Sequence, residues 1–115
     1  STNTFDNKMS KFFKLTKKGF EFDLTFFDFY LFDKRPSFYN KKFINEFGEP
    51  RKPNAVILKK HYEIAGALQR SFEKIVNHLL QILKKKGSKS GNLVLAGGAA
   101  MNCVYNGVLD KKKNV

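Results

Sequence analysis

The stretch Asn92-Leu-Val-Leu-Ala-Gly-Gly-Ala-Ala-Met-Asn102 decides the fold class, because it predicts a strand, a tight turn and a helix in immediate succession. The apolar run 93–95 is continuous, which is typical of a strand buried on both faces of a layered sheet. Gly97 and Gly98 end the run, and their missing Cβ atoms allow positive φ angles and close approach of a ligand. We therefore expect an α/β protein organised around a strand–Gly-Gly–helix unit.

The predicted turn is suited to binding phosphate. A helix that starts after two glycines presents unpaired N–H groups and the positive end of its dipole. We expect this helix to run from Ala99 to Asn106 and to stop at Gly107. Asn102 either caps or solvates the helix, or reaches back over the turn to a bound sugar or phosphate. The turn matches neither G-x-G-x-x-G nor G-x-x-x-x-G-K-[ST], so the better-known phosphate motifs are excluded.

The length and composition indicate at most one domain. The chain has 115 residues, of which 42% are hydrophobic and 15% aromatic, and this is enough for a hydrophobic core. No apolar run approaches the roughly eighteen residues of a membrane span, and no signal-peptide pattern is present. We therefore expect a soluble, cytoplasmic protein without a membrane partner.

The net charge of +12 is compatible with an anionic partner such as nucleic acid. The lysines are spread along the chain, however, and the runs 84–86 and 111–113 follow helical segments, where positive charge favours the helix C-terminus. We therefore do not expect nucleic-acid binding, although a basic nucleic-acid module remains the alternative class.

The few potential metal ligands predict no metal site within this chain. Cys103, His61 and His78 are too few for an internal zinc site, so any metal must be completed by residues elsewhere. Cys103 lies close to Met101 and Val104, with no base near it in sequence. We expect it to be a small buried hydrophobe rather than a nucleophile.

The N-terminal half predicts a β-hairpin and an aromatic segment. Residues 1–10 are polar and we expect them to be flexible; residues 11–53 form the hairpin and an aromatic insertion. The arms 11–15 and 20–24 flank Thr16-Lys-Lys-Gly19, with Gly19 in a left-handed turn position. In the second arm, alternation predicts one buried face made of Phe20, Phe22 and Leu24.

A cluster of aromatic and apolar residues follows the hairpin without a clear period: Phe26, Phe27, Phe29, Tyr30, Leu31 and Phe32. These residues either line a ligand-binding pocket or fill the hydrophobic core. The thirteen phenylalanines of the chain, without a tryptophan, favour core filling. Residues 38–47 then predict a short helix with Gly48 at its C-cap. Arg51 lies in the proline-bounded connector that follows. Its guanidinium is either a surface charge or binds a phosphate or carboxylate through two hydrogen bonds.

Residues 54–115 form the segment that contains the predicted phosphate turn, and this segment begins with a long amphipathic helix over 61–85. Its apolar residues recur at spacings of three and four: Ile64, Leu68, Phe72, Ile75, Val76, Leu79 and Leu83. We expect this stripe to lie against the sheet that contains 93–95. Gln69 lies at the edge of the stripe, where its amide either is solvated or enters a site.

Two motifs together resemble a known family. Leu95-Ala-Gly-Gly-Ala-Ala-Met-Asn-Cys-Val-Tyr-Asn-Gly107, preceded by His61-Tyr-Glu-Ile-Ala-Gly-Ala-Leu-Gln69, is similar to the paired signature of O-carbamoyltransferases of the nodulation-factor and antibiotic-tailoring type. Upstream blocks follow the same order at similar spacing: Gly19 to Leu24, Phe27, Tyr30, Phe38-Tyr39, Phe43 and Phe47 to Arg51. The resemblance therefore covers most of the chain. The glutamine helix and Gly-Gly-x-x-x-Asn also resemble tRNA threonylcarbamoyltransferases, which have an actin-like ATPase fold.

The resemblance implies a part of an actin-like (ribonuclease H-like) domain. In such enzymes one domain forms carbamoyl adenylate from carbamoyl phosphate and ATP, and the actin-like domain passes the carbamoyl group to a hydroxyl of a small-molecule acceptor. Gly97, Gly98 and Asn102 would bind the adenosine phosphate part of ATP or carbamoyl adenylate.

The departures from the family pattern imply that this chain alone is inactive. The family's metal-binding histidines precede this segment, and a further acidic ligand follows the glycine turn at a greater distance than this sequence contains. Its partners would then be the missing parts of the parent enzyme, or further copies of itself. A freestanding nucleotide-binding module is the other alternative.

Overall fold

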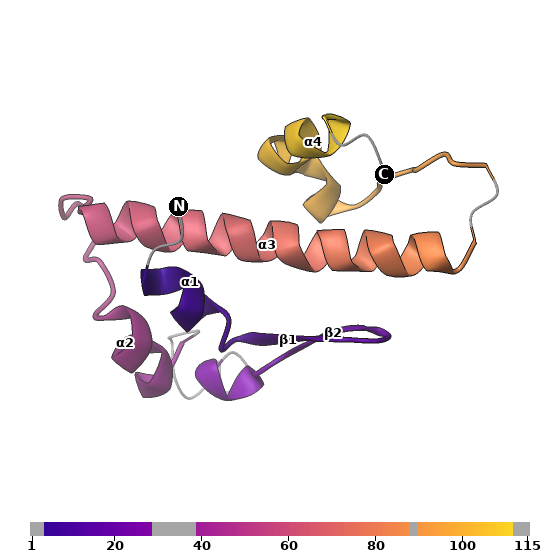
Figure 1. Ribbon diagram of the computed structural model, residues 1–115. Helices are drawn as coiled ribbons and strands as arrows, with labels where there is room; N and C mark the ends of the chain where they lie inside the picture. The colour runs from indigo at the N-terminus through magenta and orange to yellow at the C-terminus, as the bar shows by residue number, and fades with distance from the viewer. Residues whose placement is uncertain (1–3, 29–38, 88–89, 112–115) are drawn as a thin grey trace.

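One long helix, α3 (Lys59–Lys85), forms the axis of the molecule, as the computed structural model of residues 4–28, 39–87 and 90–111 shows (Figure 1). Its 27 residues span about 40 Å at 1.5 Å per residue, and the longest dimension of the molecule is 49 Å. The N-terminal elements lie along one side of α3, and the C-terminal segment lies along the other. The described part mixes helices with a single β-hairpin, which confirms the broad α/β class.

The N-terminus forms a helix that the sequence prediction missed. Residues 4–9 are helix α1 (Thr4–Met9), whereas we expected the first ten residues to be flexible. Phe5 and Met9 lie one turn apart on the same face of α1, and Met9 is buried in the core. The Asp6 carboxylate accepts a hydrogen bond from Arg70 Nε of α3 at 2.8 Å. These contacts fix α1 against α3.

The predicted hairpin is confirmed as β1 (Phe13–Thr16) and β2 (Gly19–Phe22), which are antiparallel. The loop itself is Lys17 and Lys18, and Gly19, the first residue of β2, has a positive φ of 156°. His78 Nε2 of α3 donates to the Thr16 carbonyl oxygen at 2.6 Å and ties the hairpin to the helix.

The buried face predicted for the second hairpin arm is wrong. Phe20, Phe22 and Leu24 are all exposed, with Phe22 at 54%. A two-stranded hairpin offers no second layer to cover this face, so the Phe20 and Phe22 rings pack edge to face on each other, 5.1 Å apart.

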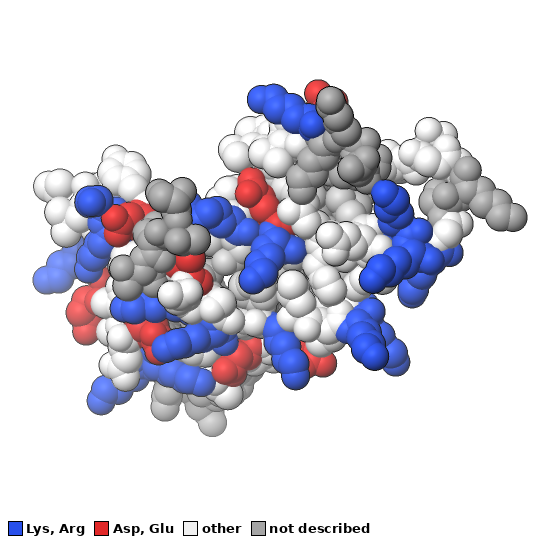
Figure 2. Space-filling view, in the orientation of Figure 1, with Lys and Arg blue, Asp and Glu red and all other residues white. Residues whose placement is uncertain are grey.

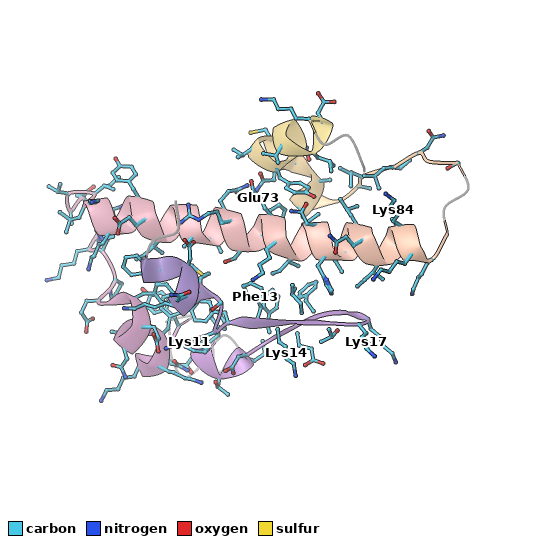
Figure 3. All side chains as sticks on the ribbon, viewed as in Figure 1. Lys11, Phe13, Lys14, Lys17, Glu73 and Lys84 are labelled. Carbon is cyan, nitrogen blue, oxygen red and sulfur yellow. The ribbon has the colours of Figure 1, made fainter. Side chains whose placement is uncertain are left out.

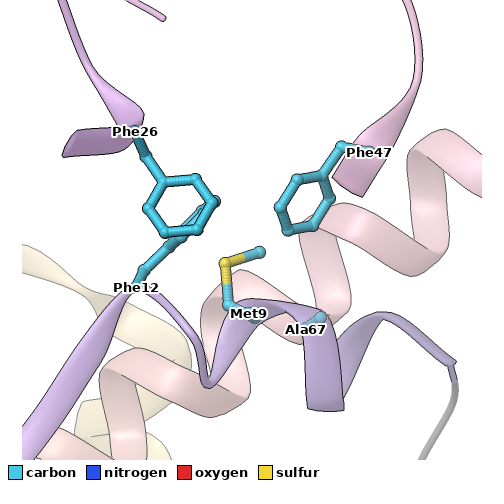
Figure 4. Close-up of a cluster of buried hydrophobic side chains, with 5 residues drawn as sticks. All are labelled: Met9, Phe12, Phe26, Phe47 and Ala67. Atoms are coloured by element: carbon cyan, nitrogen blue, oxygen red, sulfur yellow. The ribbon is translucent and has the colours of Figure 1, made fainter. Parts of the chain in front are cut away.

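The core is a phenylalanine cluster between α1, the hairpin base, η1 (Leu24–Phe26), α2 (Lys41–Phe47) and α3. Its buried members are Met9, Phe12, Phe26, Phe47 and Ala67 (Figure 4). The Phe12 ring lies 4.5 Å from the Phe26 ring, edge to face, and 5.2 Å from Phe43. Core filling is thus confirmed for Phe26 and Phe27, while residues 29–32 lie outside the described residues.

Helix α2 confirms the predicted short helix and its glycine cap. Asn40 precedes the helix, and its side-chain oxygen accepts from the Lys42 amide at 3.0 Å and from the Phe43 amide at 3.3 Å. Gly48 ends the helix with φ +89°, and its N–H donates to the Ile44 carbonyl at 2.7 Å.

The long helix is confirmed, but its apolar stripe does not pack as we expected. Ala67 is fully buried and Ile64 packs against the core, whereas Leu68 is 60% exposed and Leu83 is 51% exposed. The segment 93–95 has no strand partner within the described residues, and its middle residue, Val94, is 88% exposed. The predicted strand and its sheet are therefore wrong for this chain, because a strand needs a neighbouring strand to satisfy its backbone.

The C-terminal segment forms two short helices, η3 (Gly98–Met101) and α4 (Cys103–Asp110), which Asn102 separates. Helix α4 continues through Gly107, so the predicted stop there is wrong. A glycine within a helix costs only about 1 kcal/mol relative to alanine, and this helix accommodates it. Cys103 is exposed in the first turn of α4, which corrects our expectation of a buried thiol.

Candidate nucleotide site at the glycine turn

The glycine turn leaves its backbone open on the surface. Gly97 has φ +91°, a conformation that side chains rarely adopt, and Gly98 begins η3 without a positive φ. A Cβ atom built on either glycine would meet no atom within 4 Å. The space over both residues is therefore free for a ligand.

Asn102 lies at the end of η3 and pairs with Gln69 of α3. Gln69 Nε2 donates to Asn102 Oδ1 at 3.1 Å, and Asn102 Nδ2 donates to Gln69 Oε1 at 3.0 Å. Asn102 Oδ1 also accepts from the Tyr105 amide at 2.9 Å and caps α4. The structure thus shows that Asn102 caps α4, and the contact of its side chain with a sugar or phosphate stays a prediction. It also brings together the two sequence motifs, 33 residues apart, through a reciprocal amide pair.

Two further residues of α3, Glu73 and Asn77, continue the row that begins at Gln69. Their spacing of four places all three on one face of the helix, and Figure 3 shows Glu73 on the side of α3 toward α4. Gln69 Nε2 lies 3.4 Å from Glu73 Oε1. Glu73 and Asn77 were not predicted as site residues. The signal that could have identified them is the interval of four residues from Gln69 to Glu73 and from Glu73 to Asn77.

Tyr105 joins α4 to the same face of α3. Its side chain is only 2% exposed, its ring meets the Phe72 ring edge to face at 5.8 Å, and its hydroxyl donates to Asn77 Oδ1 at 2.9 Å. Burial raises the pKa of Tyr105, and the negative charge of Glu73 raises it further. Tyr105 therefore stays a neutral hydrogen-bond donor at physiological pH.

Asn106 ties α4 to η3. Its Nδ2 donates to the Ala100 carbonyl at 2.8 Å, while its Oδ1 is buried without a partner among the described residues. Apolar side chains nearby point outward: Met101 is 83% exposed and Val104 58% exposed. The turn is thus held from the α3 side by polar contacts and is bordered on its open side by apolar surface.

Other candidates from the sequence lie away from this turn. Arg51 is exposed, and its Nη1 donates to the Ala55 carbonyl oxygen at 2.6 Å. The guanidinium therefore makes a local hydrogen bond within the connector between α2 and α3. A groove of about 350 Å³ lies along α3 beside Leu15 and His78, and the glycine turn does not line it. Lys and Arg side chains are scattered over the face in Figure 2, among acidic and uncharged residues, and do not gather at one place.

Neither a metal cluster nor a membrane helix occurs in the parts of the chain that the structure describes. No three His, Cys, Asp or Glu side chains there lie close enough to hold a metal ion. No helix among residues 4–28, 39–87 and 90–111 combines the length and the apolar character needed to cross a membrane.

The family model of the carbamoyltransferase N-terminus matches residues 2–114, which is nearly the whole chain. The chain belongs to the carbamoyltransferase family. This carbamoyltransferase chain is also 40% identical over 80 residues to "Uncharacterized protein sll1178" of Synechocystis sp.. The alignment covers 66% of this chain and 13% of that protein, so the chain spans a small part of its relative. No solved structure matches the chain.

Proposed function

We propose that this chain is part of an O-carbamoyltransferase of the nodulation-factor or antibiotic-tailoring type. Such an enzyme moves a carbamoyl group from carbamoyl adenylate to a hydroxyl of a small-molecule acceptor. The chain would supply part of the nucleotide site through Gly97, Gly98 and Asn102. The observation that carries the proposal is the Gln69–Asn102 amide pair, which fixes the open glycine turn beside α3.

The turn's contribution is to bind and orient a phosphate. Backbone N–H groups of Gly97 and Gly98 would approach the phosphate, which the absence of side chains on both glycines permits. Asn102 uses its oxygen for Gln69 and the Tyr105 amide, so its role is to hold the turn in shape. In the transfer step the acceptor hydroxyl would lose its proton to solvent or a base of the parent enzyme, its oxygen would bond to the carbamoyl carbon, and the bond from that carbon to the phosphate oxygen of adenosine monophosphate would break. An oriented phosphate fixes that leaving group.

The remaining parts of the site would come from the rest of the parent enzyme. We propose that residues 92–96, with their exposed apolar side chains, complete a strand of an actin-like domain there. A divalent metal would be bound by residues outside this chain. The use of ATP also supports a cytoplasmic location.

Pyrophosphate release by the full-length protein tests this function. The protein is incubated with ATP, with and without carbamoyl phosphate, and pyrophosphate is measured. We expect release that depends on carbamoyl phosphate, since carbamoyl phosphate is hydrolysed to carbamate and inorganic phosphate, and the carbamate oxygen then displaces pyrophosphate from the α-phosphate of ATP. Equal release with and without carbamoyl phosphate, or none under either condition, would contradict the proposal.

A further inference from the structure

Polar and aromatic groups make the directional contacts between α4 and α3. The aliphatic residues Val104 and Val108 of α4 are 58% and 40% exposed. The contacts toward α3 come from Asn102 and Tyr105, at the cap and in the first turn of α4. Because hydrogen bonds are directional, this contact defines the position of α4 more sharply than it stabilises it.

The two hydrogen-bonded contacts lie at successive points along one helix face. Gln69 pairs with Asn102, and Asn77, eight residues later on α3, accepts from the Tyr105 hydroxyl at 2.9 Å. Two turns of helix separate the two attachment points, about 12 Å at 1.5 Å per residue. One attachment alone would let α4 pivot, whereas two attachments fix its direction.

We infer that Asn77 and Tyr105 are positioning residues for the glycine turn. Their hydrogen bond orients α4, and α4 in turn sets the direction of η3 and of the backbone amides at Gly97 and Gly98. Asn106 transmits the constraint, because it lies in α4 next to Tyr105 and donates to Ala100 of η3 at 2.8 Å. This inference rests on the proposed function, since it assigns the two residues a role in nucleotide affinity. Neither residue touches the nucleotide.

The test compares Tyr105→Phe, Asn77→Ala and the double variant in the full-length protein. Tyr105→Phe removes only the hydroxyl and keeps the ring against Phe72. Loss of one neutral hydrogen bond corresponds to about a fivefold change in an equilibrium. We therefore expect amide hydrogen exchange at residues 97–102 to rise about fivefold, and ATP affinity to fall by a similar factor. The double variant should be no worse than either single variant.

Tyr62→Phe is the matched control, because Tyr62 also lies on α3 and its side chain is 68% exposed. It should change neither measurement. Exchange in the phenylalanine core should stay constant in all variants, since a purely structural defect would raise exchange there as well. Unchanged exchange at residues 97–102 in Tyr105→Phe would overturn the inference, whether or not ATP binds.

The ATP measurement separates this inference from the proposed function. Raised exchange together with weakened ATP binding supports both. If the wild-type protein binds no ATP, the proposed function is contradicted. Hydrogen exchange at residues 97–102 then still tests whether Tyr105 and Asn77 position the turn. Raised exchange with unchanged ATP affinity would leave the nucleotide site intact and would overturn the positioning role of Asn77 and Tyr105.

Discussion

The two sides of α3 are held together by different forces. On the N-terminal side, phenylalanine rings from four elements bury one another around Met9 and Ala67. On the C-terminal side, the glycine turn and α4 are attached by amide and hydroxyl hydrogen bonds, while aliphatic residues such as Val94 remain exposed. The first side stabilises the fold, and the second sets the geometry of a surface turn.

This difference separates stability from function. Apolar burial contributes roughly 25 cal/mol per Å² and depends little on direction, so the aromatic side can absorb small shifts. A phosphate site needs N–H groups aimed at one point, and directional hydrogen bonds supply that aim. Substitutions on the two sides should therefore differ both in size and in which measurement they change.

The largest effect should follow from breaking the aromatic side. Phe26→Ala should lower the free energy of unfolding by about 3 to 5 kcal/mol, because Phe26 is 2% exposed and packs on Phe12. Denaturant unfolding measures this effect. Phe22→Ala is the matched control, since Phe22 is 54% exposed, and it should cost far less. Similar losses for both would mean that the aromatic cluster is not the core.

Breaking the amide pair should have a smaller and more local effect. Gln69→Ala removes both hydrogen bonds to Asn102 and should cost about 1 to 3 kcal/mol, because it leaves Asn102 Nδ2 without its acceptor. Hydrogen exchange should rise over residues 97–110 and stay constant in the core. Gln81→Ala, at an exposed position of α3, should change neither region. An equal rise across the whole chain would show that the two sides do not behave separately.

High pH should weaken the C-terminal side first. The folded pKa of Tyr105 is raised above the ordinary value of 10.0, so the unfolded chain loses that proton before the folded chain does. The stability from Tyr105 is fully present below pH 10 and is lost as the pH rises through the folded pKa. Unfolding measured between pH 9 and 11 should show this loss, and Tyr105→Phe should reduce it. An identical pH profile for both proteins would contradict the role of this hydroxyl.

The smallest effect should come from the surface ion pair between α1 and α3. The side chain of Arg70 is 42% exposed and that of Asp6 17% exposed, so Asp6→Asn should cost no more than about 1 kcal/mol. The difference from wild type should shrink as salt concentration rises. A loss as large as that of Phe26→Ala would mean that charge pairing, rather than the aromatic rings, holds α1 in place.

The sequence predicted the elements whose signals are local. The spacing of Ile64, Phe72 and Ile75 predicted α3, and Gly48 lies at the predicted C-cap of α2. The start of α2 was not predicted, because Asn40 lay inside the helix expected over 38–47 but is its N-cap. It failed where the outcome depends on neighbours. The run 93–95 has the composition of a buried strand, but the described residues provide no strand beside it.

The candidate site was predicted only in part, for a similar reason. Asn102 and Gln69 were identified, and the structure pairs them. Asn77 and Tyr105 were not identified. Each is an ordinary residue of its helix in the sequence, and a role for them follows only from the hydrogen bond between them in the folded chain. Nothing in the local sequence indicates a contact between residues 28 positions apart.

The proposed nucleotide site at the glycine turn is tested most directly by the ATP affinity of Gly98→Ala compared with that of Gly107→Ala, each measured by titration of the full-length protein. Both glycines lack a positive φ, and a Cβ on either meets open space, so neither substitution strains the fold. If the backbone at Gly98 lies against a nucleotide phosphate, Gly98→Ala should weaken ATP binding more than about tenfold, because the new methyl group occupies the approach. Gly107→Ala should bind ATP like the wild type. Equal affinities in the two variants would contradict the nucleotide site at this turn.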